Sequence, residues 1–393
     1  MRRLRVSAQR VLSDCLGTRA KLQITRQLAG GTTSTVLRME VRGDGLPASV
    51  VVKAAVPKFT RLLFNDWAAT ELLTRLGADS PVCARFYGGD PEVPLIVLED
   101  LGDGAGSPFR LVAGADPDAA TTALIEYSRT LARLHGQARQ HMDEFRLARQ
   151  ALGPVSPTRP LYTDPWSDAA EHSDADIDGA IASYRAVLNS VDVRPRPGVD
   201  AEIAAVTRRV EDDPGTLLGL CRGDMNGLEH CLLSAGALRV HDFGVCGYRH
   251  VLTEGMSHRV NWGCVRRLPS SVITAMDRAY QRELSRDIPE LAVHPVYNQA
   301  ATDALARWHI FHVISRLPEA LVGDRPRGAA TLRQQTVAWI DAFVQRHAEH
   351  SVLPALGDTA GRLALRLRRL WPPETHTIPY FPAFVRSERS GTR

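Results

Sequence analysis

The stretch CRGDMNGLEHCLLSAGALRVHDFG, from Cys221 to Gly244, is the part of the sequence that decides the fold. It places Asp224 after a glycine, then two short apolar runs joined by a turn, then Asp242 in front of Phe-Gly. Two short strands joined at Ser234–Ala237 are expected to bring Asp224 and Asp242 close together. Two carboxylates at the mouth of one hairpin suit a catalytic base and a metal ligand. The plain alternative is a pair of turn-forming aspartates.

Length and composition indicate an ordinary globular protein. The 393 residues suit two or three average domains or one large two-lobed one. The 48 Lys+Arg against 44 Asp+Glu give a net charge of only +4, which argues against a nucleic-acid partner. The basic start, MRRLRVSAQRVLSDCLG, lacks the apolar stretch of a signal peptide, and no run of about 18 apolar residues is present. Six scattered cysteines without a C-x-x-C pair predict reduced thiols, so we expect a cytoplasmic protein without a membrane span.

Residues 1–101 are expected to form a sheet lobe that begins with a basic helix. The range 23–57 reads as strands because alternating and β-branched runs are separated by Gly-rich turns. The range 61–77 has helical spacing and ends at a glycine. Two more strands around a Gly/Pro turn follow, and then an acidic, Gly-containing hinge at 99–104.

Residues 102–393 are expected to form a larger helical lobe. The segment PDAATTALIEYSRTLARLHGQA is strongly amphipathic, with Leu124, Tyr127, Leu131 and Leu134 on one face. We predict a Pro-rich surface insertion at 151–176, further helices, and one interruption by the hairpin at 219–244. The fold class is therefore α+β, with two lobes.

Two features of the first lobe suit the binding of phosphates. The turn AGGTTST offers Gly30, Gly31, Thr32, Thr33 and Ser34, whose backbone and hydroxyl donors could approach a phosphate. A hairpin turn without any ligand needs the same residue types.

Lys53 lies inside the buried-strand pattern SVVVKAA, where an ammonium needs an anionic partner unless it reaches water at the strand end. Glu71 on the next helix is the expected partner, and Asp66 is the less favoured alternative.

Taken in order, these motifs resemble the aminoglycoside phosphotransferase and choline kinase branch of the kinase-like superfamily. The resemblance extends over roughly residues 22–345. It is carried by LAGGTTSTVLRMEV, VVVK, ELLTRLG, LIVLEDLGDG, LARLHG, RGD…HDFG and MDRAYQREL. It implies a two-lobed protein kinase-like fold that binds ATP and Mg²⁺. The acceptor would be a hydroxyl of a small molecule or of a peptide Ser/Thr.

The resemblance also implies roles for single residues. Lys53 would hold the α- and β-phosphates, and Glu71 would hold Lys53. Asp224 would accept or orient the proton of the acceptor hydroxyl, and Asp242 would bind magnesium. The backbone from Glu99 to Leu101 would meet the adenine.

The catalytic loop departs from the family pattern at two positions. Arg222 stands where the family has His, and it would stabilise the loop or contact a phosphate rather than act as a base. The metal-binding Asn is replaced by Glu229, or by His230 if the loop holds one extra residue; Asn226 could also reach in. Glu229 is a hard oxygen donor that suits magnesium, whereas the nitrogen of His230 is a poor ligand for it.

Three functions are compatible with this pattern. The favoured one is an active ATP-dependent kinase in which the set of metal ligands is altered. The second is a pseudokinase-type binding module that holds a nucleotide, a peptide or a protein partner without turnover. The third keeps the fold but changes the chemistry, for example to nucleotidyl transfer. No motif indicates a particular oligomeric state.

The segment after Gly244 is expected to line the acceptor pocket. Its candidate lining residues are Tyr248, Arg249, His250, Glu254, His258, Arg259 and Trp262. Because this set is more basic than acidic, it favours a neutral or anionic acceptor over a polycation.

Overall fold

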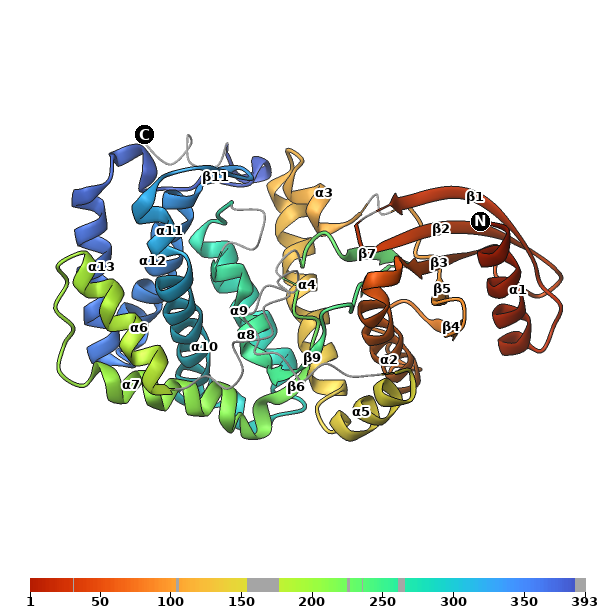
Figure 1. Cartoon of the computed structure of the whole chain (residues 1–393), viewed down its shortest axis with the longest axis horizontal. Coiled ribbons are helices and arrows are strands. Elements are labelled where there is room, and N and C mark those ends of the chain that lie inside the picture. Colours follow the sequence, from red (N-terminus) through yellow and green to blue (C-terminus); the bar gives the residue numbers. More distant parts are fainter. Residues whose placement is uncertain are drawn as a thin grey trace.

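The computed structural model describes residues 1–30, 32–103, 106–153, 177–224, 227–234, 236–260 and 266–385. It has two lobes that lie side by side, a sheet lobe at the N-terminal end and a larger helical lobe (Figure 1). The predicted α+β two-lobed class is confirmed. Most of the predicted Pro-rich insertion, from residue 154 to 176, lies outside the described residues.

The first lobe is built on a five-stranded antiparallel sheet with the order β1-β2-β3-β5-β4. The strands are β1 (Lys21–Gly30), β2 (Ser34–Arg42), β3 (Ser49–Ala55), β4 (Phe86–Asp90) and β5 (Leu95–Glu99). Helix α1 (Arg2–Leu16) precedes the sheet, and helix α2 (Thr60–Leu76) connects β3 to β4. The two helices pack on opposite faces of the sheet, because buried residues of α1 and of α2 belong to two separate hydrophobic clusters.

The alternation of strand β3 decides where Lys53 points. Successive side chains of a strand face opposite sides of the sheet. Val50, Val52 and Ala54 face the side that α1 covers, where they pack with buried residues of that helix. Lys53 therefore points to the other side, which carries α2.

The second lobe is mostly helical (Figure 1). Its helices are α3 (Pro108–Val112), α4 (Pro117–Gln137), α5 (Met142–Ala151), α6 (Ile177–Ser190), α7 (Val199–Thr207), α8 (Val251–Gly255), α9 (Ser270–Leu284), α10 (His294–Ser315), α11 (Leu317–Val322), α12 (Leu332–His350) and α13 (Pro354–Leu370). The predicted inward face of α4 is confirmed, since Leu124, Tyr127, Leu131 and Leu134 are all buried. Asp116 caps this helix, its carboxylate accepting hydrogen bonds from the N–H groups of Asp118 and Ala119.

Short strands near the junction of the two lobes carry the loops that contain Asp224 and Asp242. Strand β6 (Leu218–Cys221) pairs with β9 (Gly247–His250), while β7 (Cys231–Ser234) pairs with β8 (Ala237–Val240). A further small ladder joins β10 (Pro326–Arg327) and β11 (Ala330–Thr331).

The single hairpin expected over 219–244 is thus two separate ladders. The predicted turn at Ser234–Ala237 is correct, but Asp224 follows β6 rather than either arm of that hairpin. The hairpin also reaches the first lobe, because the Val240 N–H donates to the carbonyl of Val82 at 2.8 Å. Among the described residues, no helix combines the length and the apolar character that a membrane crossing requires.

Candidate active site

Lys53 lies between two carboxylates that come from different parts of the chain. Its Nζ is 2.6 Å from Asp66 Oδ2 on α2 and 2.8 Å from Asp242 Oδ1 after β8. Burial alone would lower the pKa of Lys53, but the two carboxylates outweigh it and raise this pKa above its ordinary value. The expected Lys53–Glu71 pair is wrong: Glu71 instead accepts a hydrogen bond from Trp67 Nε1 at 3.0 Å.

Helix α2 also holds the turn that carries Asp242. Asp66 Oδ1 accepts a hydrogen bond from the backbone N–H of Phe243 at 3.0 Å. Asn65, the preceding residue, donates its Nδ2–H to the carbonyl of Gly244 at 2.9 Å. The position of Asp242 is therefore coupled to α2 by two hydrogen bonds as well as by Lys53.

Asp242 combines a partly exposed carboxylate with an unusual backbone conformation. Its φ of 66° lies in the left-handed region, which costs a residue other than glycine on the order of 1 kcal/mol. Its side chain is 39% exposed, so the carboxylate is open to a ligand. Burial alone would raise the pKa of Asp242, but the charges of Lys53 and His230 lower it, so the group is ionised at neutral pH.

His230 lies between the two aspartates that the sequence singles out. Its Nδ1 is 2.9 Å from Asp224 Oδ2, an ion-pair contact without the alignment of a full hydrogen bond. Its Nε2 is 3.9 Å from Asp242 Oδ2. The side chain of Glu229 is exposed. Of the three candidates for the missing Asn, the structure therefore places His230 against both aspartates, while Asn226 lies outside the described residues.

Arg222 is directed away from this site into the core. Its side chain has no exposed surface, and Nε lies 3.3 Å from Glu254 Oε1. A guanidinium nitrogen also lies 3.4 Å from the hydroxyl of Tyr127, and the backbone N–H donates to Glu254 Oε2 at 2.7 Å. The prediction that Arg222 contacts a phosphate is therefore wrong. Arg222 anchors the start of the loop, and Gly223, with a φ of 76°, turns the chain so that Asp224 emerges half-buried.

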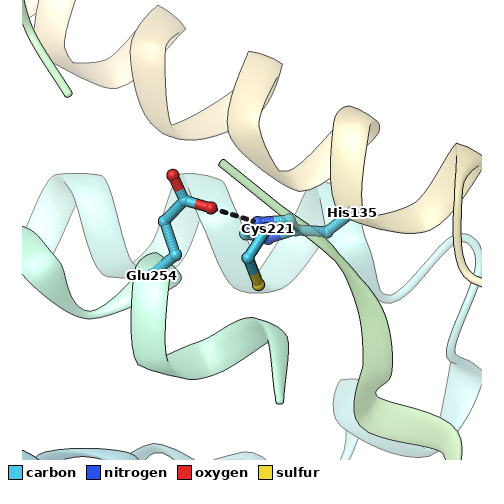
Figure 2. Close-up of side chains that lie close together, drawn as sticks. All are labelled: His135, Cys221 and Glu254. Carbon is cyan, nitrogen blue, oxygen red and sulfur yellow. Dashed lines mark hydrogen bonds and ion pairs between the residues drawn. The ribbon is translucent and has the colours of Figure 1, made fainter. Parts of the chain in front are cut away.

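A second cluster lies beneath this anchor and has the residue types of a metal site. Figure 2 shows His135, Cys221 and Glu254 close together, with ligand atoms within 4.8 Å of one another. His135 and Glu254 already have partners: the ring nitrogens of His135 contact the Tyr280 hydroxyl at 2.6 Å and Glu254 Oε2 at 3.2 Å. Burial holds the pKa of the Cys221 thiol well above its ordinary value, which disfavours the thiolate that binds a metal. This cluster is a buried polar network that supports the loop.

The predicted phosphate turn lies where β1 passes into β2. Gly30 ends β1 and Ser34 begins β2, and between them Thr32 is exposed and Thr33 half-buried. The Thr33 carbonyl accepts a hydrogen bond from the N–H of Val56 at 2.9 Å, which fixes the turn against the end of β3. Gly31 lies outside the described residues.

The predicted hinge follows β5. The N–H of Glu99 donates to the Arg85 carbonyl at 2.8 Å, so this donor is engaged within the protein. The Glu99 carboxylate accepts from the Arg85 N–H at 3.0 Å, and Leu101 is buried with Leu63 and Leu98. A contact of the Glu99–Leu101 backbone with adenine stays a prediction.

The segment after Gly244 does not supply the expected charges to an acceptor pocket. Glu254 pairs with Arg222, and both His258 and Arg259 contact the carboxylate of Asp277 in the interior. His250 is buried as well. The argument for a neutral or anionic acceptor therefore loses most of its basis.

The remaining candidates of that segment are placed differently. The Tyr248 hydroxyl donates to the Ala138 carbonyl at 2.7 Å, and Arg249 lies beside Gly223 of the catalytic loop. Trp262 lies outside the described residues.

Comparisons with known proteins give similarity at the level of structure. No protein-family model and no curated protein matches the sequence. A choline kinase from Streptococcus pneumoniae is 13% identical, with 89% of this chain and 97% of that chain covered and a TM-score of 0.39. An ethanolamine kinase from Plasmodium vivax is 8% identical, with 83% and 82% covered and a TM-score of 0.41. An amicoumacin kinase in complex with AMP-PNP and Ca²⁺ is 10% identical, with 88% and 86% covered and a TM-score of 0.45. The likeness to these kinases is one of fold alone, and the chemistry of this chain is argued from its own side chains.

Proposed function

We propose that the chain is an ATP-dependent phosphotransferase that moves the γ-phosphate to a hydroxyl group, most readily one on a small molecule. The observation that carries this proposal is the convergence of Lys53, Asp242 and Asp224, the last two bridged by His230, at the junction of the lobes. Phosphoryl transfer asks a protein mainly for positioning and charge stabilisation, which a lysine and carboxylates on a rigid frame provide. Asp66 and Asn65 tie this frame to α2 by hydrogen bonds.

Each of these side chains has a distinct role in the proposed reaction. Lys53 holds phosphate oxygens, exchanging part of its contact with Asp242 for the nucleotide, while Asp66 keeps the ammonium in place. Asp242, ionised and open to ligands, is the anchor for a divalent cation. A carboxylate fits such an ion, and the bound cation would neutralise charge on the phosphates.

The transfer itself conserves atoms and charge. The acceptor oxygen forms a bond to the γ-phosphorus while the bond from that phosphorus to the β–γ bridging oxygen breaks. The proton of the hydroxyl passes to Asp224, and ADP leaves with the bridging oxygen. Asp224 suits this task because it follows the Gly223 turn at the half-buried end of β6.

A second candidate function is nucleotide binding without turnover. One observation favours it: His230 occupies the space between Asp224 and Asp242, where an oxygen ligand for Mg²⁺ would be expected. The Lys53 contacts would serve nucleotide binding equally well in this case.

One experiment separates the two functions. ATP binding is measured by calorimetry, and ADP release is followed with a panel of small-molecule alcohols and a pool of Ser/Thr peptides, in Mg²⁺ and separately in Mn²⁺. An active kinase requires turnover in the wild type and its loss in Asp224→Asn, with ATP affinity within about threefold of the wild type. ATP binding without turnover under every condition would instead establish the binding module. Turnover that persists in Asp224→Asn would refute the role of Asp224.

A further inference from the structure

The donor atoms of the candidate cation site differ from the all-oxygen set that Mg²⁺ prefers. Asp242 contributes a carboxylate whose two oxygens have separate partners. Oδ1 contacts Lys53 Nζ at 2.8 Å, and Oδ2 faces His230 Nε2 at 3.9 Å. Since the ammonium occupies Oδ1, Oδ2 is the oxygen directed toward the imidazole.

The spacing between these two atoms allows one ion to reach both. Bonds from divalent metals to imidazole nitrogen and carboxylate oxygen are about 2.0–2.2 Å long, so an ion can bridge donors up to about 4.4 Å apart. The 3.9 Å between His230 Nε2 and Asp242 Oδ2 is within this reach. Both side chains are partly exposed, so the gap is accessible to an ion that arrives with a nucleotide.

The charge of Asp224 lies beside the other ring nitrogen of His230. Its Oδ2 lies 2.9 Å from His230 Nδ1, which has no hydrogen-bond partner among the described residues. The negative charge of a carboxylate this close favours the proton on the adjacent ring nitrogen, which leaves the other nitrogen as a lone-pair donor. Here the nitrogen left as a donor is Nε2, the one that faces Asp242.

Glu229 is placed differently from its neighbour His230. Its side chain is exposed, whereas that of His230 is about three-quarters buried and lies between the two aspartates. Glu229, the residue that precedes His230, thus offers a matched control on the same loop.

We propose that this site selects a divalent transition-metal ion, of the Mn²⁺ and Co²⁺ class, over Mg²⁺, with His230 as the residue that determines the preference. The proposal rests on the proposed function for the presence of a cation site. Imidazole binds first-row transition metals well, whereas Mg²⁺ dehydrates reluctantly and prefers oxygen. His230→Asn replaces the nitrogen by an amide oxygen and should shift the preference toward Mg²⁺.

The test measures metal binding directly, in the presence of a non-hydrolysable ATP analogue. Mn²⁺ binding is followed by electron paramagnetic resonance, Co²⁺ binding by its visible absorption, and each is competed with Mg²⁺. We expect the wild type to bind Mn²⁺ and Co²⁺ at least tenfold more tightly than Mg²⁺, and we expect the visible bands of bound Co²⁺ to shift when His230 is replaced by Asn. His230→Asn and His230→Gln should lower this ratio about tenfold or more, in line with the usual cost of altering a metal's immediate surroundings.

Two controls make the result decisive. Glu229→Gln should leave the ratio unchanged, and Asp242→Asn should weaken the binding of all three ions. Equal affinities for Mg²⁺ and Mn²⁺ in the wild type, or an unchanged ratio in both folded His230 variants, would overturn the proposal. Because the readout is binding, a chain that shows this selectivity without turnover in any metal would refute the proposed phosphotransferase activity and leave this inference intact.

Discussion

Asp66 joins Lys53 to the turn that carries Asp242. One carboxylate oxygen lies 2.6 Å from the Lys53 ammonium, and the other accepts a hydrogen bond from the Phe243 N–H at 3.0 Å. Asp66 is almost fully buried, so its charge depends on these partners for compensation. Helix α2, Lys53 and the turn that carries Asp242 therefore form one connected unit.

The first prediction tests this connection. Asp66→Asn keeps the shape of the side chain but removes its charge, so Lys53 loses one of two counter-ions. We expect ATP affinity to fall at least tenfold, about 1.4 kcal/mol of binding free energy, because the ammonium is no longer held in place. Calorimetry with an ATP analogue measures the change.

Glu71→Gln is the matched control for Asp66→Asn. Glu71 lies on the same helix and contacts Trp67 rather than Lys53. Its substitution should leave ATP affinity within twofold of the wild type. A larger loss in Glu71→Gln than in Asp66→Asn would restore the pairing that the resemblance implies.

The choice between these two acids illustrates what sequence alone could predict. The strand pattern around Lys53 and the helix that follows it were both predictable, because alternation and helical spacing are local properties. The partner depends on which face of the helix meets the sheet. The buried stripe of Leu63, Asp66, Thr70 and Leu73 contains Asp66 and excludes Glu71. An acidic residue within an apolar stripe is the signal in the sequence that points to Asp66.

The loop after β6 shows a different limit to what the sequence could predict. Asp224 and Asp242 could be singled out because each follows a short apolar run. The inward direction of Arg222 could not, because its counter-ion Glu254 lies on α8 and is distant in sequence. The position of His230 likewise depends on where β7 starts relative to β6, and the two strands belong to different ladders.

The second prediction concerns the glycine before Asp224. Gly223 has a φ of 76°, and a Cβ at this position would lie 2.4 Å from the Val245 carbonyl oxygen. Gly223→Ala therefore has to shift backbone as well as adopt a strained φ. We expect the free energy of unfolding to fall by about 2–4 kcal/mol and turnover to be lost, as measured by urea denaturation and ADP release.

Gly236→Ala separates the two sources of strain. Its φ of 79° is similar, but no atom lies within 4 Å of the added Cβ. Only the conformational cost of about 1 kcal/mol should remain, with turnover preserved. Equal destabilisation by the two substitutions would show that the contact with Val245 is unimportant.

The third prediction concerns the buried pair of Arg222 and Glu254. Glu254→Gln leaves the guanidinium in the core with its charge uncompensated, which typically costs about 3–5 kcal/mol. Arg222→Met in the same chain removes that charge, so the double variant should recover at least half of the lost stability. Urea denaturation of the single and double variants measures the coupling. A double variant less stable than Glu254→Gln would mean that Arg222 stabilises the loop by packing alone. The exposed pair of Arg185 and Asp200 is the control, and Asp200→Asn should leave stability unchanged within error.

The last prediction is a loss of stability in mild acid caused by buried histidines. Burial lowers the pKa of His309 to about 3 and that of His250 to about 4, and it lowers the pKa of His312 well below the ordinary value of 6.5. These groups stay neutral in the folded protein, whereas the unfolded chain takes up their protons as the pH falls below 6.5. Their stabilising contribution is therefore complete above this pH and is lost as the pH falls toward 4. Each group adds up to about 1.4 kcal/mol per pH unit to the loss.

Carboxylates whose pKa is lowered by folding do not cause a loss of stability in the pH range where the histidines do. Asp277, whose pKa is lowered by His258 and Arg259 against the opposing effect of burial, loses its contribution only below its ordinary value of 3.8. His312→Phe supplies the test, because His312 stacks on Trp339 at 3.7 Å between ring centres and a phenyl ring can take its place. Urea denaturation at several pH values between 7.5 and 5 gives the dependence of the unfolding free energy on pH. In this variant we expect that dependence to correspond to one proton fewer taken up on unfolding, with stability at pH 7.5 equal or higher. An unchanged slope would mean that His312 is protonated in the folded protein, and the attribution of the acid sensitivity to buried neutral histidines would then be wrong.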